Sequence, residues 1–260
     1  MAARILTFDI ETQRAQVEVF NLWPKYIPID RVLKPARVLC FSARWRGEDK
    51  DIFYAAWDDD DDGAYEKMLR AIWKLLDQAD VVVTWNGDRF DLQWIEEECG
   101  RLGMGRPGPY KSVDLLKVAK RRFKAGLMSL KLEWSARQWL RDGKVDHRGT
   151  DLWHDIRHGT RAEKRAACAL MREYCEHDTQ LTEQIFERYL PWVSVNLALF
   201  NPPDDELLHC TKCNSTNLWR DGKRYYHTLA GLYQVWRCRD CGASSRGKRM
   251  KNTTELRPTP

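Results

Sequence analysis

Two carboxylates stand in an otherwise apolar run, at a spacing that would let both bind one metal ion. The segment ILTFDIET, residues 5–12, carries Asp9 and Glu11 two positions apart. In an extended strand, residues two apart project from the same face, so these two like charges repel unless a cation such as Mg²⁺ or Mn²⁺ lies between them. Taken alone, the pair is better explained as two solvated acids on an edge strand than as a metal site. A metal site therefore needs further carboxylates.

Further acidic positions come from two distant segments. In VVVTWNGDRFDLQWI an apolar strand ends at the turn Asn86-Gly87, and Asp91 follows in the first turn of a helix. In MREYCEHDTQLTEQIF, Tyr174 and Asp178 are four residues apart on a predicted long helix, so they share one face and are separated by one turn. A phenol and a carboxylate placed this way can reach one point.

Four cysteines near the C-terminus form a second group of candidate ligands. Cys210, Cys213, Cys238 and Cys241 make two C-x-x-C pairs separated by 24 residues. Without a secretion signal, this spacing favours zinc over disulfides, and it predicts a structural, tetrahedral site in a zinc ribbon whose hairpin carries the intervening chain. Such a short segment buries little core, so metal binding would supply much of its folding free energy.

Composition indicates a globular protein with a basic end. The 260 residues are 43% hydrophobic and include 12 Trp, enough for one substantial core and a small appendage. No long apolar run or signal segment is visible, so we expect a soluble, cytoplasmic chain without membrane contact. The net charge of +5 lies entirely from Asp204 onward, which is consistent with a polyanionic partner.

The order of the predicted elements favours an α/β domain with a mixed sheet. Apolar runs predict strands and periodic runs predict helices; the strands are residues 4–10, 37–45, 51–57 and 80–85, and the helices are residues 64–79, 90–103, 112–123, 130–140 and 161–190. The five consecutive acids 58–62 are expected to be a solvated helix cap rather than a metal site. Loss of periodicity and two prolines near residues 201–208 predict domains at 1–200 and 204–260.

Three motifs carry a resemblance to a known family. FDIET, TWNGDRFDLQW and YCEHD, in that order, resemble the three exonuclease motifs of the DnaQ-like 3′–5′ exonucleases, a branch of the ribonuclease H-like fold. A tyrosine four residues before the last acid resembles the tyrosine-containing (DEDDy) subclass. The segment SVDLLKVAKRRFKAGLMSLKLEWSARQWL is similar to the proofreading domain of family B DNA polymerases. The resemblance covers about residues 4–190 and implies a mixed sheet flanked by helices.

The resemblance also implies a reaction and roles for the acids. It implies hydrolysis of phosphodiester bonds at 3′ ends, preferably of single-stranded DNA in replication or repair, with two Mg²⁺ or Mn²⁺ ions. Asp9 would bridge the ions, Glu11 and Asp178 would complete the site that activates water, and Asp91 would support the second ion through water. Tyr174 would orient the attacking water, because a phenol of pKa near 10 is a poor base at neutral pH.

Several residues near these motifs can be interpreted either as substrate contacts or as structural residues. Asn86 and Phe90 would line the cleft, although Phe90 is as well explained as a core contact; Thr12 and Lys131 are weaker candidates for substrate contacts. The basic run Lys117–Lys124 is better explained as a solvated helix face than as a phosphate track. Ribbon aromatics could stack bases or cover the zinc site, and the segment 246–260 is expected to be a disordered basic end.

Two other functions stay open at this point. A catalytically inactive copy of the fold could serve as a nucleic-acid adaptor, although a scaffold has no reason to keep four repelling carboxylates. An exoribonuclease is equally compatible with the motifs. The ribbon could bind nucleic acid or a replication or repair protein.

Overall fold

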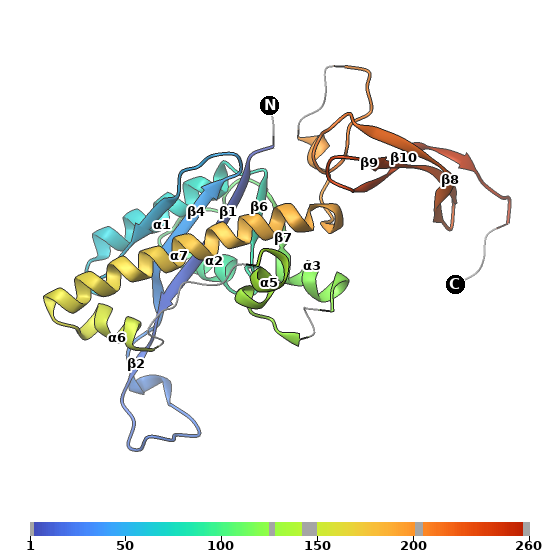
Figure 1. Cartoon of the computed structure of the whole chain (residues 1–260). Helices are drawn as coiled ribbons and strands as arrows, with labels where there is room; N and C mark the ends of the chain where they lie inside the picture. The colour runs from blue at the N-terminus through green and yellow to red at the C-terminus, as the bar shows by residue number, and fades with distance from the viewer. Residues whose placement is uncertain (1–2, 125–127, 142–149, 201–204, 257–260) are drawn as a thin grey trace. The chain divides into compact units, whose positions relative to one another are not determined.

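A five-stranded mixed sheet is the centre of the larger of two compact units. The computed structural model describes residues 3–124, 128–141, 150–200 and 205–256, and it divides into the units Arg4–Ile185 and Phe186–Pro260. The sheet has the strand order β5-β4-β1-β6-β7 (Figure 1). Its strands are β1 (Ile5–Gln13), β4 (Arg37–Trp45), β5 (Ile52–Ala55), β6 (Val81–Thr84) and β7 (Lys111–Asp114).

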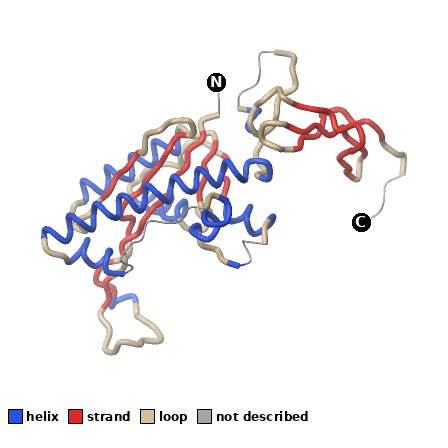
Figure 2. The backbone as a smooth tube through the Cα atoms, viewed as in Figure 1, coloured by secondary structure: helices blue, strands red, loops and turns tan. Residues whose placement is uncertain are grey.

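Strand directions make the sheet mixed. β1 pairs antiparallel with β4 and parallel with β6, β4 pairs antiparallel with β5, and β6 pairs parallel with β7. A two-stranded extension of β2 (Gln16–Val17) and β3 (Val32–Lys34) follows β1. The predicted α/β fold with a mixed sheet flanked by helices is confirmed, and Figure 2 shows the alternation of strand and helix along the chain.

Helices cover both faces of this sheet (Figure 1). One face packs against α1 and α2, and the other packs against α6 and α7. The helices of the unit are α1 (Asp62–Asp77), α2 (Asp91–Arg101), α3 (Leu115–Arg122), α5 (Leu132–Trp139), α6 (Thr150–His158) and α7 (Arg161–Tyr189). Within the described residues, none of the helices combines the length and apolar character that a membrane span requires.

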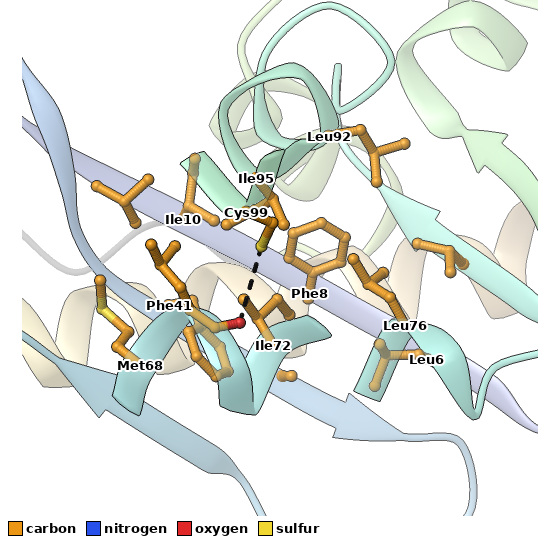
Figure 3. Packing of buried hydrophobic residues seen from close by; sticks show 14 of the residues in the cluster. Leu6, Phe8, Ile10, Phe41, Met68, Ile72, Leu76, Leu92, Ile95 and Cys99 are labelled. Carbon is orange, nitrogen blue, oxygen red and sulfur yellow. Dashed lines mark hydrogen bonds between the residues drawn. The ribbon is translucent and has the colours of Figure 1, made fainter. Parts of the chain in front are cut away.

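The β1 side chains alternate between two environments. Leu6, Phe8 and Ile10 are buried against α1 and α2, where Ile72 and Ile95 meet them (Figure 3). Apolar residues at helical spacing give α1 and α2 their buried stripes, so burial of these side chains supplies the main driving force for this layer. The odd-numbered positions of β1 consequently face the α7 side of the sheet.

The smaller unit contains a three-stranded antiparallel sheet beside the cysteines. Its strands are β8 (Leu218–Thr228), β9 (Gly231–Cys238) and β10 (Ser244–Asn252), in the order β10-β9-β8. Residues preceding it also belong to this unit: the Leu197 N–H donates to the Thr211 carbonyl at 2.8 Å, and the Lys212 ammonium donates to the Val193 carbonyl at 2.7 Å. The boundaries 1–200 and 204–260 remain a prediction, and residues 201–204 of the expected linker lie outside the described residues.

Two predicted elements were wrong. Residues 112–114, assigned to the start of a helix, belong to the edge strand β7, and Asp114 then caps α3 by accepting the Leu116 N–H at 3.0 Å. Residues 246–252, expected to be disordered, form part of β10, because β9 offers a free edge with which they pair. Residues 257–260 of that end lie outside the described residues.

The acidic run 58–62 is more than a solvated cap. Asp61 caps α1 as expected, accepting the Ala64 N–H at 2.9 Å. Asp59, however, is 13% exposed in its side chain. It accepts a hydrogen bond from Arg157 Nη2 of α6 at 3.2 Å, and its carboxylate lies 2.8 Å from Arg157 Nε and 4.0 Å from Arg37 of β4. Burial raises the pKa of Asp59, but the hydrogen bond and charge of Arg157 outweigh burial and hold that pKa below its ordinary value.

Replacing Asp59 should therefore destabilise the domain. Because Asp59→Asn removes a charged hydrogen-bond acceptor from Arg157, we expect the free energy of unfolding at pH 7 to fall by about 2 kcal/mol. The matched variant Asp60→Asn, at a side chain 90% exposed, should change it by less than about 0.5 kcal/mol. Urea denaturation followed by tryptophan fluorescence measures both.

The effect of Asp59 should also depend on pH in one direction. Because the folded-state pKa is lowered, the stabilisation is present above the unfolded pKa of about 3.9 and is lost as the pH falls through the lower folded value. The difference between wild type and Asp59→Asn should therefore shrink below pH 4. Equal stability of the two proteins at pH 7 would contradict this account.

Candidate active site

The carboxylates of β1 lie on the face that the apolar residues leave free. Phe8 and Ile10 are 0% and 3% exposed, whereas Asp9 and Glu11 are both partly exposed on the opposite face. The pairing with β4 shifts register between Glu11 and Thr12, which marks a β-bulge immediately after the pair. Bulges end regular pairing and redirect side chains, and they are common beside active sites.

Helix α7 is fixed against β1 and β4 on either side of Asp178. The Cys175 thiol contacts the Asp9 carbonyl oxygen at 3.7 Å, and the Thr179 hydroxyl donates to the Ser42 carbonyl at 3.3 Å. Asp9 and Ser42 are cross-strand partners in the sheet. Since Cys175 and Thr179 are both completely buried, α7 has little freedom to rotate, and Asp178 is directed at the acids of β1.

Three carboxylates converge at this point. One oxygen from each of Asp9, Glu11 and Asp178 lies within 4.8 Å of the other two. Three negative charges this close repel, and a hard divalent cation is the partner that oxygen ligands select. This group could therefore hold a metal ion.

Asp91 is not part of this three-carboxylate group in the described structure. It begins α2, is 1% exposed, and accepts the backbone N–H of Ile10 at 3.0 Å, between Asp9 and Glu11 in sequence. Burial, together with the charge of Asp114, raises the pKa of Asp91 to about 7, although the hydrogen bond from the Ile10 N–H acts to lower it. A nearby divalent cation would favour the ionised form.

A pocket of about 580 Å³ opens onto the acids. Asp9, Tyr174 and Asp178 line it, with Tyr174 7% exposed and one helical turn from Asp178. Asn86 and Lys131 line it as well. The pocket thus brings residues from four distant segments around one space, with a phenol and an amide beside the carboxylates and an ammonium group available for a phosphate.

Other predicted contacts lie outside the lining of this pocket. Phe90 is 38% exposed and packs edge-on against Trp94 with ring centroids 6.4 Å apart, which fits the alternative of a local packing role. Thr12 follows the bulge, and its carbonyl accepts the Trp153 indole N–H at 3.1 Å. Both residues remain predictions as substrate contacts.

Several lining residues were missed or underrated in the sequence, the carboxylate Glu133 among them. Trp85 donates its indole N–H to the Leu130 carbonyl at 3.0 Å, which ties the loop carrying Lys131 to the end of β6. Arg89 and Lys120 also line the pocket. Arg89 stands within the NGDRFD motif itself, whereas Lys120 belongs to the basic run that was better explained as a solvated helix face.

The turn that carries Asn86 is sterically demanding. Asn86 has a φ of 69°, and its N–H donates to Asp114 Oδ1 at 3.0 Å. At Gly87 a Cβ would lie 2.2 Å from the Thr84 hydroxyl oxygen, so a side chain there would clash with β6. Asn tolerates left-handed backbone better than most residues, and only glycine fits beside Thr84, so the two requirements together explain the Asn-Gly pair at this strand end.

The four cysteines form a separate metal-binding group. The Sγ atoms of Cys210, Cys213, Cys238 and Cys241 all lie within 4.8 Å of one another. Each pair is followed by a residue with positive φ, Asn214 at 61° and Gly242 at 75°, so both turns curve in the same way around the sulfurs. Four thiolates in two such turns are compatible with a zinc ribbon.

One known protein family matches most of the larger unit. The RNase_H_2 family model, described as RNase_H superfamily, matches residues 33–190, more than half of the chain. The chain belongs to the RNase H superfamily. A search of curated proteins finds none that matches this sequence.

Membership of the RNase H superfamily indicates a nuclease-type hydrolase that binds nucleic acid, and RNase H-like nucleases use divalent metals. The matched region contains Asp91, Tyr174 and Asp178 but begins downstream of Asp9 and Glu11. In the structure, however, Asp178 of the matched region lies within 4.8 Å of both acids of β1, so the matched and unmatched segments form one group of carboxylates.

Loss of one carboxylate should weaken metal binding without unfolding the protein. We expect Asp9→Asn to raise the Kd for Mn²⁺ roughly tenfold or more, because one ligand of the three-carboxylate group is lost. The matched control is Asp88→Asn, since Asp88 bonds to Ser112 and Lys117 beside a different pocket. Calorimetric titration measures both; unchanged Mn²⁺ affinity in Asp9→Asn would refute the site.

Proposed function

We propose that this protein is a metal-dependent 3′–5′ exonuclease of the DnaQ-like, tyrosine-containing type, acting on single-stranded DNA ends in replication or repair. The observation that supports it most is the convergence of Asp9, Glu11 and Asp178, two of which, Asp9 and Asp178, line a pocket together with Tyr174. In this proposal the three sequence motifs contribute to a single centre.

The carboxylates would hold the ions and divide their roles. When bound, two divalent ions supply an activated water and offset the charge that develops at phosphorus. Asp9 and Asp178 both belong to the three-carboxylate group and line the pocket, and the family resemblance would give Asp9 the bridging role. Glu11 and Asp178 would complete one ion site. Asp91, held by Ile10, would act on the second ion through water ligands.

Tyr174 would position the nucleophile. Its ring is buried in the cluster that α6 and α7 form against the sheet, and it lies one helical turn from Asp178. An ordinary phenol titrates near pH 10 and is a poor base at neutral pH. We therefore assign it a hydrogen bond to the attacking water rather than proton removal.

Cationic side chains that line the pocket would bind the strand. Lys131, Lys120 and Arg89 place three cationic groups around the pocket, and each can contact a phosphate oxygen. Asn86 offers an amide to the terminal nucleotide. An unpaired strand end enters such a pocket more readily than a duplex does, so we infer a single-stranded substrate.

Digestion of a 5′-labelled oligonucleotide tests the function directly. With Mg²⁺ or Mn²⁺ we expect a ladder that shortens from the 3′ end, and Asp9→Ala should abolish it because the bridging ligand is lost. The exposed-acid variant Asp60→Asn controls for loss of negative charge alone and should keep the ladder.

The same digestion run on DNA and RNA of one sequence distinguishes a deoxyribonuclease from an exoribonuclease. Faster shortening of the DNA strand is expected. The absence of cleavage on either strand, with either metal, would contradict the proposal and favour a non-catalytic adaptor.

A further inference from the structure

The three-stranded sheet of the cysteine-bearing unit has two chemically different faces. Cross-strand partners share a face, and the register pairs Tyr226 with Tyr233 and Trp219 with Arg237 between β8 and β9. Arg246 of β10 pairs with Val235, two residues from Tyr233, and so joins the same face. We call this set, Trp219, Tyr226, Tyr233, Arg237 and Arg246, the aromatic face.

These rings do not cover the metal site. The buried cluster around the sulfurs consists of the four cysteines with Ala243 and Leu218, and it includes none of the aromatic-face residues. Trp219 remains 38% exposed and Tyr226 51% exposed. The sequence left open whether these aromatics pack over the zinc site or contact a ligand, and their packing and exposure favour a ligand.

The cations of the same face are arranged around the rings. The Arg246 guanidinium lies 4.4 Å from the Tyr233 ring centroid and 5.6 Å from that of Tyr226. Arg237 is oriented by Asp221, whose carboxylate it contacts at 3.1 Å. Residues 218–252 as a whole contain nine Lys or Arg and only two acids, so this sheet attracts polyanions.

The cations of the opposite face have partners as well. Arg220 donates to the Gln234 side chain at 2.8 Å, and Lys251 lies 4.2 Å from the Tyr225 ring centroid and hydrogen-bonds its hydroxyl. Cations on both faces therefore have partners, and the faces differ in their rings. Trp219 and Tyr226 of the aromatic face are exposed, whereas Tyr225 and Trp236 of the opposite face are only partly exposed. Ring exposure thus identifies the aromatic face as the side better suited to an external partner.

We propose that the aromatic face binds single-stranded nucleic acid, with bases stacked on Trp219, Tyr226 and Tyr233 and phosphates contacting Arg237 and Arg246. Stacking on aromatic rings requires unpaired bases and tolerates any sequence, and a cationic surface follows the backbone. An acidic protein would use the charge but not the rings. The choice of nucleic acid rests on the proposed function, since the substrate of that enzyme would be the ligand held here.

Fluorescence anisotropy with a labelled 30-mer of deoxythymidine tests this face in the full-length chain. Binding is measured on an Asp9→Ala background, so the result does not depend on whether the protein cuts nucleic acid. Trp219→Leu combined with Tyr226→Leu should raise Kd roughly tenfold or more, because two stacking platforms are lost. The matched control, Tyr225→Leu with His227→Leu, removes two rings from the same strand on the opposite face.

Zinc content is measured for each protein, because retained metal shows that the variant is folded.

A second variant, Arg246→Gln, should reduce the slope of log Kd against log salt by about 0.7, as expected for one lost phosphate contact. The proposal is overturned if the aromatic-face variant binds as tightly as its parent, or if both ring pairs cause the same loss. Tighter binding of an acidic peptide than of the oligonucleotide would also overturn it.

Discussion

The packing of α7 across β1 and β4 is the constraint on which the candidate site depends. Left to electrostatics alone, three carboxylates would separate, yet Asp9, Glu11 and Asp178 have oxygens within 4.8 Å. Buried contacts at Cys175 and Thr179 hold the helix on the sheet and oppose that repulsion. Core packing therefore holds the three carboxylates in place before a cation binds.

Hydrogen bonds from backbone N–H groups to buried carboxylates fix the segments around the site. Asp91 accepts the Ile10 N–H and fixes the start of α2 against β1. Asp114 accepts the N–H groups of Asn86 and Leu116 through one oxygen, which joins the end of β6 to the start of α3. Burial raises the pKa of Asp114, whereas its backbone hydrogen bonds lower that pKa. Both acids therefore contribute to the site through backbone positions as well as charge.

Local rules were sufficient for much of this arrangement. Alternation along β1 correctly separated Phe8 and Ile10 from the two acids, and apolar periodicity located α1, α2 and α7. Both are determined by residues adjacent in the chain, so a sequence reveals them. The fold class followed from the order of these elements.

Features that depend on distant partners were not predictable in this way. β7 is only four residues long and becomes a strand because β6 offers it an edge, and β10 likewise depends on β9. Lys120 has the same local pattern as its solvated neighbours and reaches the pocket only through the docking of α3. Arg89 could have been noticed, because it lies inside a motif that was already singled out.

Crystals of the protein grown with Mn²⁺ and measured at a wavelength where manganese scatters anomalously test the central claim most directly. The account predicts an anomalous peak with oxygens of Asp9 and Asp178 about 2.1 Å away and Glu11 in contact directly or through water. Manganese bound elsewhere, with Asp178 turned away from the acids of β1, would contradict it.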